Sequence, residues 1–219
     1  MAAKEFPHRK PARESIQATP SLSSHQVLAV LLCLLQPAAS QEVTANMSVP
    51  ADGHFLYFAF GSNLLRERLQ LANPSAVFVT TGRLKDYELN FGQWEQHVDN
   101  YWHGGVATIQ SHPGSEVWGV IWTLSDENLQ SLDEQEGVGQ GQYSPLKVSV
   151  DTDKGLMLCR TYQMNNFHPC PPSPQYKEVV CLGAEQNGLP VEYLEKLKTI
   201  QTNNYSGPSL LDQIRPAMK

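Results

Sequence analysis

A glycine-serine-asparagine triplet that follows a short apolar run is the first candidate for a binding site. Residues 55–60 are rich in aromatic side chains and are typical of a buried strand, and Gly61-Ser62-Asn63 then leads into a short amphipathic helix. Where a strand turns into a helix, several backbone N–H groups lack a partner, and with the helix dipole they bind anions. The triplet predicts a site for a carboxylate or a developing oxyanion, although a plain helix N-cap has the same sequence.

Glu136 is the second candidate, near the end of a helix that is predicted to begin at Ser125. At about 100° per residue, Leu129, Leu132 and Glu136 share one stripe of this helix, whereas Glu134 points to the opposite side. Burial and the carboxyl end of a helix both disfavour a negative charge, so both raise the pKa of this carboxyl. Such a glutamate suits general acid–base catalysis, although an ion pair with a nearby cation would also explain an inward carboxylate.

Other residue patterns carry weaker chemical signals. His103 could bring an imidazole near the site, or residues 102–105 could be a turn between strands. No serine, histidine and aspartate set or cysteine and histidine set has a catalytic signature, and the histidines lack metal-ligand spacing. Residues 171–174 predict a rigid extended loop, which either presents Tyr176 over a pocket or docks a partner.

The elements that must position these residues are mostly consecutive strands with helices inserted between them. Turn residues separate the strands, and a further helix opens at Pro190. This order predicts an α+β fold with a mainly antiparallel, barrel-like sheet. The strands are expected near residues 76–81, 86–91, 105–110, 116–124, 143–151 and 156–164.

Composition limits the class of protein. The chain has 219 residues, 41% of them hydrophobic, and a net charge of −6, so the basic surface of a nucleic-acid-binding protein is missing. No apolar stretch approaches the roughly 18 residues that a membrane span requires. The four cysteines form no C-x-x-C pair, which argues against a zinc ribbon or a disulfide framework.

Residues 1–54 form an N-terminal tail of different character. A basic segment, the apolar run 27–35 and small residues ending at Ser40 have the order of a secretory signal, but a disordered extension explains them equally well. We expect a folded domain over residues 55–205 and a C-terminal tail over 206–219. Because the domain shows no disulfide pattern, the cytosol is the expected location, with secretion as the alternative.

Taken in order, these pieces resemble the γ-glutamylcyclotransferase family. The resemblance implies a small α+β fold around a strand barrel, a homodimer and no cofactor or metal. It also implies the conversion of a γ-glutamyl amino acid to 5-oxoproline and the free amino acid. The segments that carry it are residues 55–65, 102–105, 116–120, 131–138, 171–177 and 188–190.

By matching position, the resemblance assigns roles to eight residues. Glu136 corresponds to the acid–base glutamate of the family, and Tyr176 corresponds to a tyrosine that closes over the substrate. The residues that correspond to the substrate-binding loop are Tyr57, Phe58, Ala59, Phe60, Gly61 and Ser62.

Phe60 departs from the family, whose loop commonly has tyrosine at this position. If the missing hydroxyl contacts the substrate, transition-state stabilisation falls by about 1–3 kcal/mol, the value of a buried hydrogen bond. The alternative interpretation is a relative that binds a ligand or partner without turnover. A third is the same chemistry on glutathione or γ-glutamyl-lysine.

Overall fold

The structure is a computed structural model, and it describes residues 51–95, 100–214 and 216. The apolar run 27–35 and the predicted cleavage after Ser40 lie outside the described residues. In the part of the chain that is described, none of the helices combines the length and apolar character of a membrane span.

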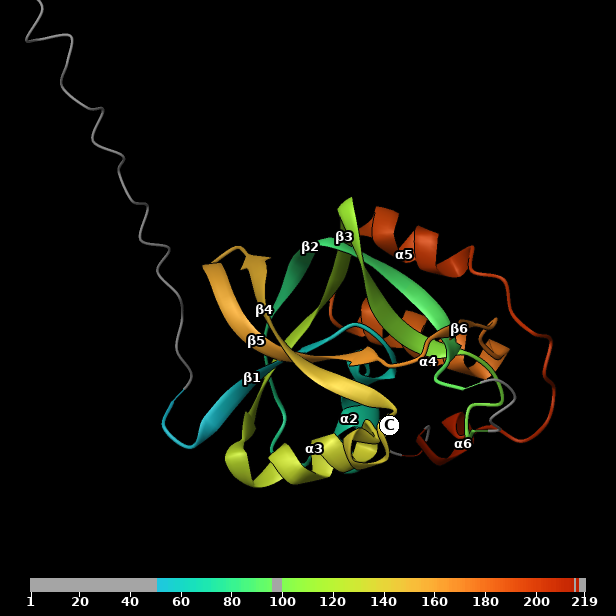
Figure 1. Cartoon of the computed structure of the whole chain (residues 1–219), viewed down its shortest axis with the longest axis horizontal. Coiled ribbons are helices and arrows are strands. Elements are labelled where there is room, and N and C mark those ends of the chain that lie inside the picture. Colours follow the sequence, from blue (N-terminus) through green and yellow to red (C-terminus); the bar gives the residue numbers. More distant parts are fainter. Residues whose placement is uncertain (1–50, 96–99, 215, 217–219) are drawn as a thin grey trace, which may run out of the picture. The chain divides into compact units, whose positions relative to one another are not determined.

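Five strands form a closed barrel (Figure 1). Their order is β3-β1-β5-β4-β2, and a further pairing between β2 and β3 closes the sheet. β1 and β5 are parallel where they pair, whereas the other pairs are antiparallel. This confirms the predicted α+β fold with a mainly antiparallel, barrel-like sheet. The strands are β1 (His54–Ala59), β2 (Val77–Gln93), β3 (Val106–Ser125), β4 (Tyr143–Thr152), β5 (Gly155–Met164) and the short β6 (His168–Pro169), which pairs with β2.

β2 and β3 are long bent strands, where the sequence predicts four short segments. The pairing of β2 with β3 shifts register near Asp86, and residues 112–115 of β3 bulge opposite it. Asp86 has a φ of 62°, and its Oδ1 accepts a hydrogen bond of 2.9 Å from Gly114 N–H. Turn-forming residues at this point therefore make a bulge within the hairpin instead of ending the strands.

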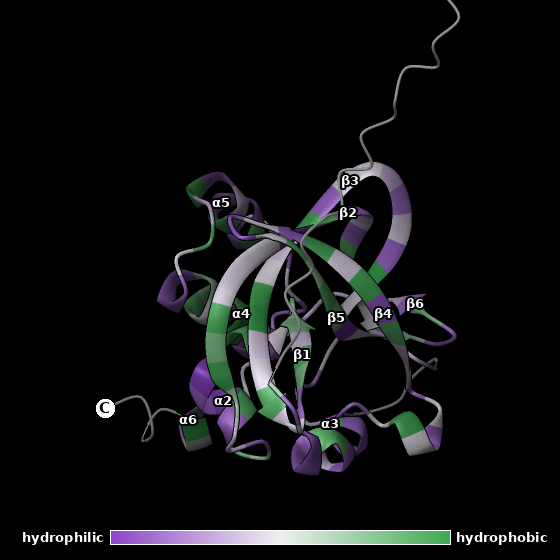
Figure 2. Ribbon diagram, turned by 90° about the vertical axis from the view of Figure 1, so that its left-hand side faces the viewer, coloured by the Kyte–Doolittle hydropathy of each residue, from purple (hydrophilic) through white to green (hydrophobic). Residues whose placement is uncertain are grey.

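The helical segments lie between the strands and after β6. In both views α3 and α6 lie toward one end of the barrel and α5 lies toward the other (Figures 1 and 2). They are η1 (Ser62–Leu64), α2 (Arg66–Gln70), η2 (Asp126–Asn128), α3 (Leu129–Gln135), η3 (Val138–Gln140), α4 (Pro174–Gln186), α5 (Val191–Lys198) and α6 (Leu211–Ile214).

α4 corrects the prediction of an extended loop that presents Tyr176. The Ser173 side chain accepts a hydrogen bond from Tyr176 N–H, and Pro174 occupies the first helical position. The end of the proline-rich segment therefore starts a helix. The buried face of α4 has helical spacing, a signal that the prediction overlooked. Its residues are Tyr176, Val179, Val180, Gly183 and Ala184.

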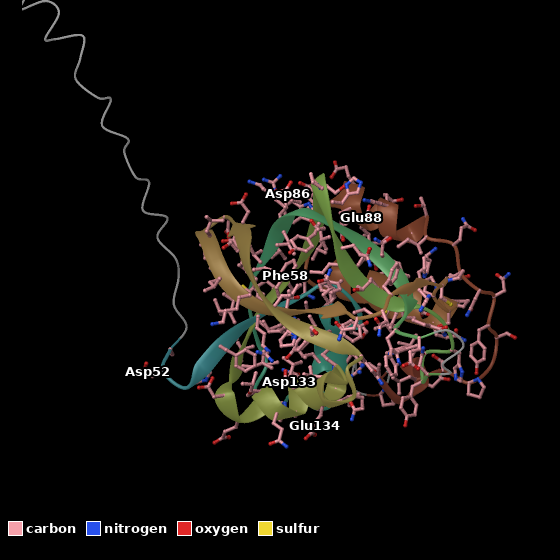
Figure 3. The ribbon with its side chains drawn as sticks, viewed as in Figure 1. Asp52, Phe58, Asp86, Glu88, Asp133 and Glu134 are labelled. Carbon is pink, nitrogen blue, oxygen red and sulfur yellow. The ribbon has the colours of Figure 1, made fainter. Side chains whose placement is uncertain are left out.

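Large apolar side chains fill the barrel. Phe58 of β1 and Trp122 of β3 are fully buried, and Figure 3 shows Phe58 among the strands. Trp122 Nε1 donates a hydrogen bond of 3.1 Å to the backbone oxygen of Asn63, which ties the loop after β1 to the core. Apolar and polar residues alternate along several strands in Figure 2, as expected for a sheet with one buried face.

α6 falls within the segment that is predicted as a C-terminal tail. Leu211 and Ile214 are buried and pack with Leu65 and Val179 in a small second core. This part of the segment thus packs as an element of the fold, and the boundary at residue 205 stays a prediction.

Candidate active site

A cavity of about 400 Å³ lies where the loop after β1, the end of α3 and the start of α4 meet. It brings together six of the eight residues that the sequence singles out. These are Tyr57, Phe60, Gly61, Ser62, Glu136 and Tyr176.

Phe58 and Ala59, the other two predicted residues, are fully buried and are not among the residues that line this cavity. Strand alternation explains the difference between neighbours, because Tyr57 points to the opposite face from Phe58. Phe58 instead packs in the core, with its ring centroid 6.4 Å from that of Phe60. A contact between these two side chains and a substrate thus stays a prediction.

Glu136 follows the last residue of α3 and faces the cavity. Its N–H donates to Leu132 O at 3.0 Å, and Gly137 then takes a left-handed φ of 64°, which ends the helix. Glu134, in contrast, is exposed and points away from the barrel in Figure 3, although it is also among the residues that line the cavity. The helical wheel thus predicts the inward direction of Glu136 correctly.

Burial raises the pKa of the Glu136 carboxyl from 4.5 to about 7. The positive charge of Arg68 and a hydrogen bond from Asn63 act against this rise, whereas the nearby Asp133 adds to it. The group is therefore able to gain and lose a proton near neutral pH, as general acid–base catalysis requires.

Asn63 holds Glu136 and Tyr57 in a fixed arrangement. Its Nδ2 donates to Glu136 Oε1 at 3.1 Å and to Tyr57 Oη at 3.0 Å. Its Oδ1 accepts a hydrogen bond of 2.9 Å from Gln135 Nε2, which fixes the orientation of the amide. Because Tyr57 Oη accepts from Asn63, the hydroxyl proton of Tyr57 can be donated to another group in the cavity.

The hydrogen-bond chain continues beyond Gln135. Asn73 is fully buried, and its Nδ2 donates to Gln135 Oε1 at 3.1 Å. Ser131 Oγ in turn donates to Asn73 Oδ1 at 2.8 Å. The links of this chain run from donor to acceptor in the order Ser131, Asn73, Gln135, Asn63 and Glu136, so the chain presents an N–H group to the carboxylate.

Tyr176 closes the cavity from α4. Its Oη accepts a hydrogen bond of 2.9 Å from Ala107 N–H, and burial raises its pKa to about 12. A Cβ added at Gly61 would lie 3.0 Å from Tyr176 Oη and 2.9 Å from Ala107 Cβ. Only glycine therefore lets this hydroxyl approach the backbone of the loop so closely.

An ion-pair network beside the cavity joins α3 to β5. Arg160 Nη2 donates to the two carboxylate oxygens of Asp133 at 2.7 and 2.9 Å, and Tyr162 Oη donates to Asp133 Oδ1 at 2.5 Å. The Tyr162 ring packs edge-on against Tyr57, with 5.9 Å between the ring centroids. This network fixes the helix that carries Glu136.

The side chains of Trp102 and His103 lie in different surroundings, although the two residues are neighbours in the sequence. Trp102 lines the cavity, and its ring lies edge-on to Tyr176 at 5.0 Å. His103 has a φ of 54° and stacks on Tyr205 at 4.2 Å, and it is not among the lining residues. The suggestion of an imidazole near the site is therefore wrong, and the turn is the correct interpretation.

Arg68 is a lining residue that the sequence analysis misses. The sequence predicts a short amphipathic helix at this point but no role for its arginines. In the structure Arg66 is exposed, whereas Arg68 lies largely buried with its guanidinium carbon 5.9 Å from the centroid of the Trp102 ring. Arg68 directly precedes the buried Leu69, but the helix is too short for its apolar pattern to place both arginines.

Among the described residues, no cluster of three or more histidine, cysteine, aspartate or glutamate side chains is suited to bind a metal ion. Cys159, Cys170 and Cys181 are free thiols.

Comparisons with known proteins identify the family. The fold and site define a small barrel protein with a carboxyl group beside a glycine loop, and the model of the AIG2-like family matches residues 116–197. A solved structure of a γ-glutamyl cyclotransferase superposes with a TM-score of 0.72 at 51% identity, and the match covers 75% of this chain and 98% of that chain.

The γ-glutamylcyclotransferase of Bos taurus is 55% identical over 158 residues, which are 71% of this chain and 84% of the bovine protein. That of Homo sapiens is 54% identical over 163 residues, 74% of this chain and 87% of the human protein. The chain belongs to the γ-glutamylcyclotransferase family, and the resemblance seen in the sequence is confirmed.

Proposed function

We propose that this protein is a γ-glutamylcyclotransferase that converts γ-glutamyl amino acids to 5-oxoproline and the free amino acid. The observation that carries the proposal is the position of Glu136, whose carboxyl has a pKa of about 7 and lines the same cavity as Gly61 and Ser62. Relatives at 54–55% identity bear this name, and nothing in the comparisons favours a relative that binds without turnover.

The reaction needs one group that moves a proton. The neutral α-amine of the substrate attacks its own γ-carbonyl carbon, a ring C–N bond forms, and the C–N bond to the leaving amino acid breaks. Glu136 accepts the proton that the attacking nitrogen loses and returns it to the departing nitrogen, so the carboxyl ends the cycle as it began. A single carboxylate therefore suffices.

The rest of the cavity holds the substrate in a folded conformation. Intramolecular attack has a high effective molarity once the amine and carbonyl are in contact, so positioning supplies much of the rate. Backbone donors around Gly61 and Ser62 hold the α-carboxylate of the γ-glutamyl group or the developing oxyanion. Tyr57 and Tyr176 enclose the reacting atoms from β1 and α4.

The proposal includes a cytosolic homodimer, as the family resemblance implies. The free thiols among the described cysteines agree with a reducing compartment. Light scattering of the purified protein measures its mass in solution, and a monomer would contradict the dimer. Mass spectrometry of the N-terminus of the protein from cells tests the location, because a chain that begins at Gln41 would show secretion.

Glu136→Gln tests the catalytic role. We expect kcat for γ-glutamyl-alanine to fall by about 10²–10⁴-fold, the usual contribution of a general acid–base group. Glu127→Gln is the matched control, because Glu127 is exposed, lies just before α3 and is not among the residues that line the cavity. Release of 5-oxoproline measures both rates, and circular dichroism checks that both variants are folded.

The outcomes are distinct. An active wild-type protein, a strongly impaired Glu136→Gln variant and a normal Glu127→Gln variant would support the proposal. Equal rates for wild type and Glu136→Gln above the uncatalysed background would exclude Glu136 as the proton-transfer group. A wild-type protein without turnover would overturn the proposed activity itself.

A further inference from the structure

Arg68 is a largely buried cation in the wall of the cavity, and the mechanism above does not use it. Its side chain lines the cavity together with Glu136 and Trp102. Its guanidinium carbon lies 5.9 Å from the centroid of the Trp102 ring, a distance at which the ring attracts the cation. Arg66, two residues earlier on the same helix, is exposed to solvent.

Arg68 forms no ion pair in the part of the chain that the structure describes. Its Nε is buried and has no hydrogen-bond partner there. None of the ion pairs found among the described residues includes Arg68. Burying an unpaired charge is unfavourable, so a buried guanidinium beside a cavity is suited to a carboxylate that the ligand supplies.

Arg68 and Glu136 influence each other without forming an ion pair. Burial lowers the pKa of Arg68 and raises that of Glu136, and the charge of each group acts against the shift of the other. The two groups therefore lie close enough to interact. In an α-amino acid the nitrogen and the carboxylate are attached to the same carbon. A cation that binds this carboxylate must therefore lie near the group that protonates the nitrogen, but beyond direct contact with it.

We propose that Arg68 binds the carboxylate of the leaving amino acid and so determines a preference for γ-glutamyl amino acids over γ-glutamyl amines and amides. This inference rests on the proposed function, in which the loop at Gly61 and Ser62 serves the γ-glutamyl group. Arg68 then serves the other half of the substrate. Its planar guanidinium offers two parallel N–H donors to a carboxylate.

The test compares two substrates that differ only in this carboxylate, γ-glutamyl-alanine and γ-glutamyl-alaninamide. For Arg68→Gln we expect kcat/KM on γ-glutamyl-alanine to fall by about 10- to 100-fold, mainly through KM, because a charged hydrogen bond is lost. On γ-glutamyl-alaninamide it should change less than threefold. The ratio of the two values in one variant cancels any effect of Arg68 on the Glu136 pKa, which the two substrates share.

Two further variants complete the design. Arg68→Lys keeps the charge and should retain part of the preference for the carboxylate, whereas Arg66→Gln is the matched surface control and should leave the ratio unchanged. Thermal unfolding checks each variant. Calorimetry with the Glu136→Gln protein, with and without Arg68→Gln, measures binding of both substrates independently of turnover.

An equal loss on both substrates would overturn the proposal, because Arg68 would then act on the γ-glutamyl half or through Glu136. No loss on γ-glutamyl-alanine would also overturn it. If wild type turns over neither substrate, the proposed activity fails. The calorimetric comparison still decides whether Arg68 recognises the terminal carboxylate.

Discussion

The carboxyl group of Glu136 experiences opposing influences within a few ångströms. Burial raises its pKa, while Arg68 and the N–H of Asn63 lower it, and the result is about 7. The position of a single side chain at the end of α3 thus decides whether a glutamate is a surface charge or a proton-transfer group.

This pKa predicts the pH dependence of activity. A general base must be deprotonated, so kcat/KM should fall as the pH drops through about 7 and then decrease about tenfold per pH unit. Arg68→Gln should move this midpoint to higher pH, because the positive charge that lowers the pKa is removed. Initial rates with γ-glutamyl-alanine from pH 5 to 9 measure both effects. A rate that is constant down to pH 5 would contradict the assignment.

Phe60→Tyr tests the departure from the family loop. The Phe60 ring lines the cavity, so a hydroxyl added there would reach the substrate or the groups around it. We expect kcat/KM on γ-glutamyl-alanine to rise by up to about 10- to 100-fold if this hydroxyl restores a buried hydrogen bond. Phe78→Tyr, on the exposed side of β2, is the control. An unchanged rate in Phe60→Tyr would show that this chain works fully with phenylalanine.

At the scale of elements, α4 links the site to the rest of the fold. A Cβ added at Gly183 would lie 2.4 Å from Leu65 N, so α4 packs directly on the backbone that follows the glycine loop. At the other end of the helix, Tyr176 lies in the first turn. The start of α4 therefore sets the position of the Tyr176 hydroxyl over Gly61.

Ser173→Ala should weaken this element. Ser173 is fully buried and caps α4 through a hydrogen bond of 3.1 Å from Tyr176 N–H. We expect the free energy of unfolding to fall by about 1–2 kcal/mol, as for other lost helix caps, and KM to rise because Tyr176 is less well placed. Urea unfolding and steady-state kinetics measure the two effects. Ser144→Ala, at an exposed position, should change neither; equal behaviour of the two variants would refute the capping role.

The sequence predicts the elements that have a strong local signal. β1, α3, β4, β5 and α5 follow from apolar periodicity and from turn or cap residues at their ends. α4 is missed because consecutive prolines suggest an extended chain, although Ser173-Pro174 also starts helices. β2 and β3 appear in the sequence as four segments, since a bulge and a turn use the same residue types.

The sequence predicts only part of the site, because only some of its residues have a local signal. Glu136 is found because its direction follows from a helical repeat that it shares with Leu129 and Leu132. Arg68 is missed because its burial depends on Trp102, which is distant in the sequence. The contact of Gly61 with Tyr176 likewise joins residues more than a hundred positions apart, and no local pattern reports such a pairing.

At the scale of the molecule, closure of the barrel makes its strands depend on one another. β3 pairs with both β1 and β2, and each of these pairs with a further strand, so no long strand is left at an edge. Gly119 lies at the contact of β3 with β1, where an added Cβ would come within 2.3 Å of Ala59 O and 2.7 Å of the Phe58 ring. The barrel is thus tightly packed directly beside the loop that carries Gly61.

Gly119→Ala should therefore destabilise the whole barrel. Overpacking of this kind costs about 1–3 kcal/mol, and the loss should appear in a single cooperative unfolding transition. Gly139→Ala is the control, because an added Cβ there meets no atom within 4 Å. Denaturant titrations followed by tryptophan fluorescence measure both variants. Equal stabilities for the two would show that the strands separate easily at this contact.

The amide chain from Ser131 to Asn63 has a consequence for chemical ageing. Spontaneous deamidation would turn an asparagine of this chain into an aspartate, which replaces a donor by an acceptor and reverses the polarity of every later link. The usual route begins when the next residue's backbone nitrogen attacks the side-chain amide. At Asn73 this route is closed, because Pro74 follows and has no N–H. The polar connection behind Glu136 is thereby protected at its most buried asparagine against slow loss of ammonia over the lifetime of the protein.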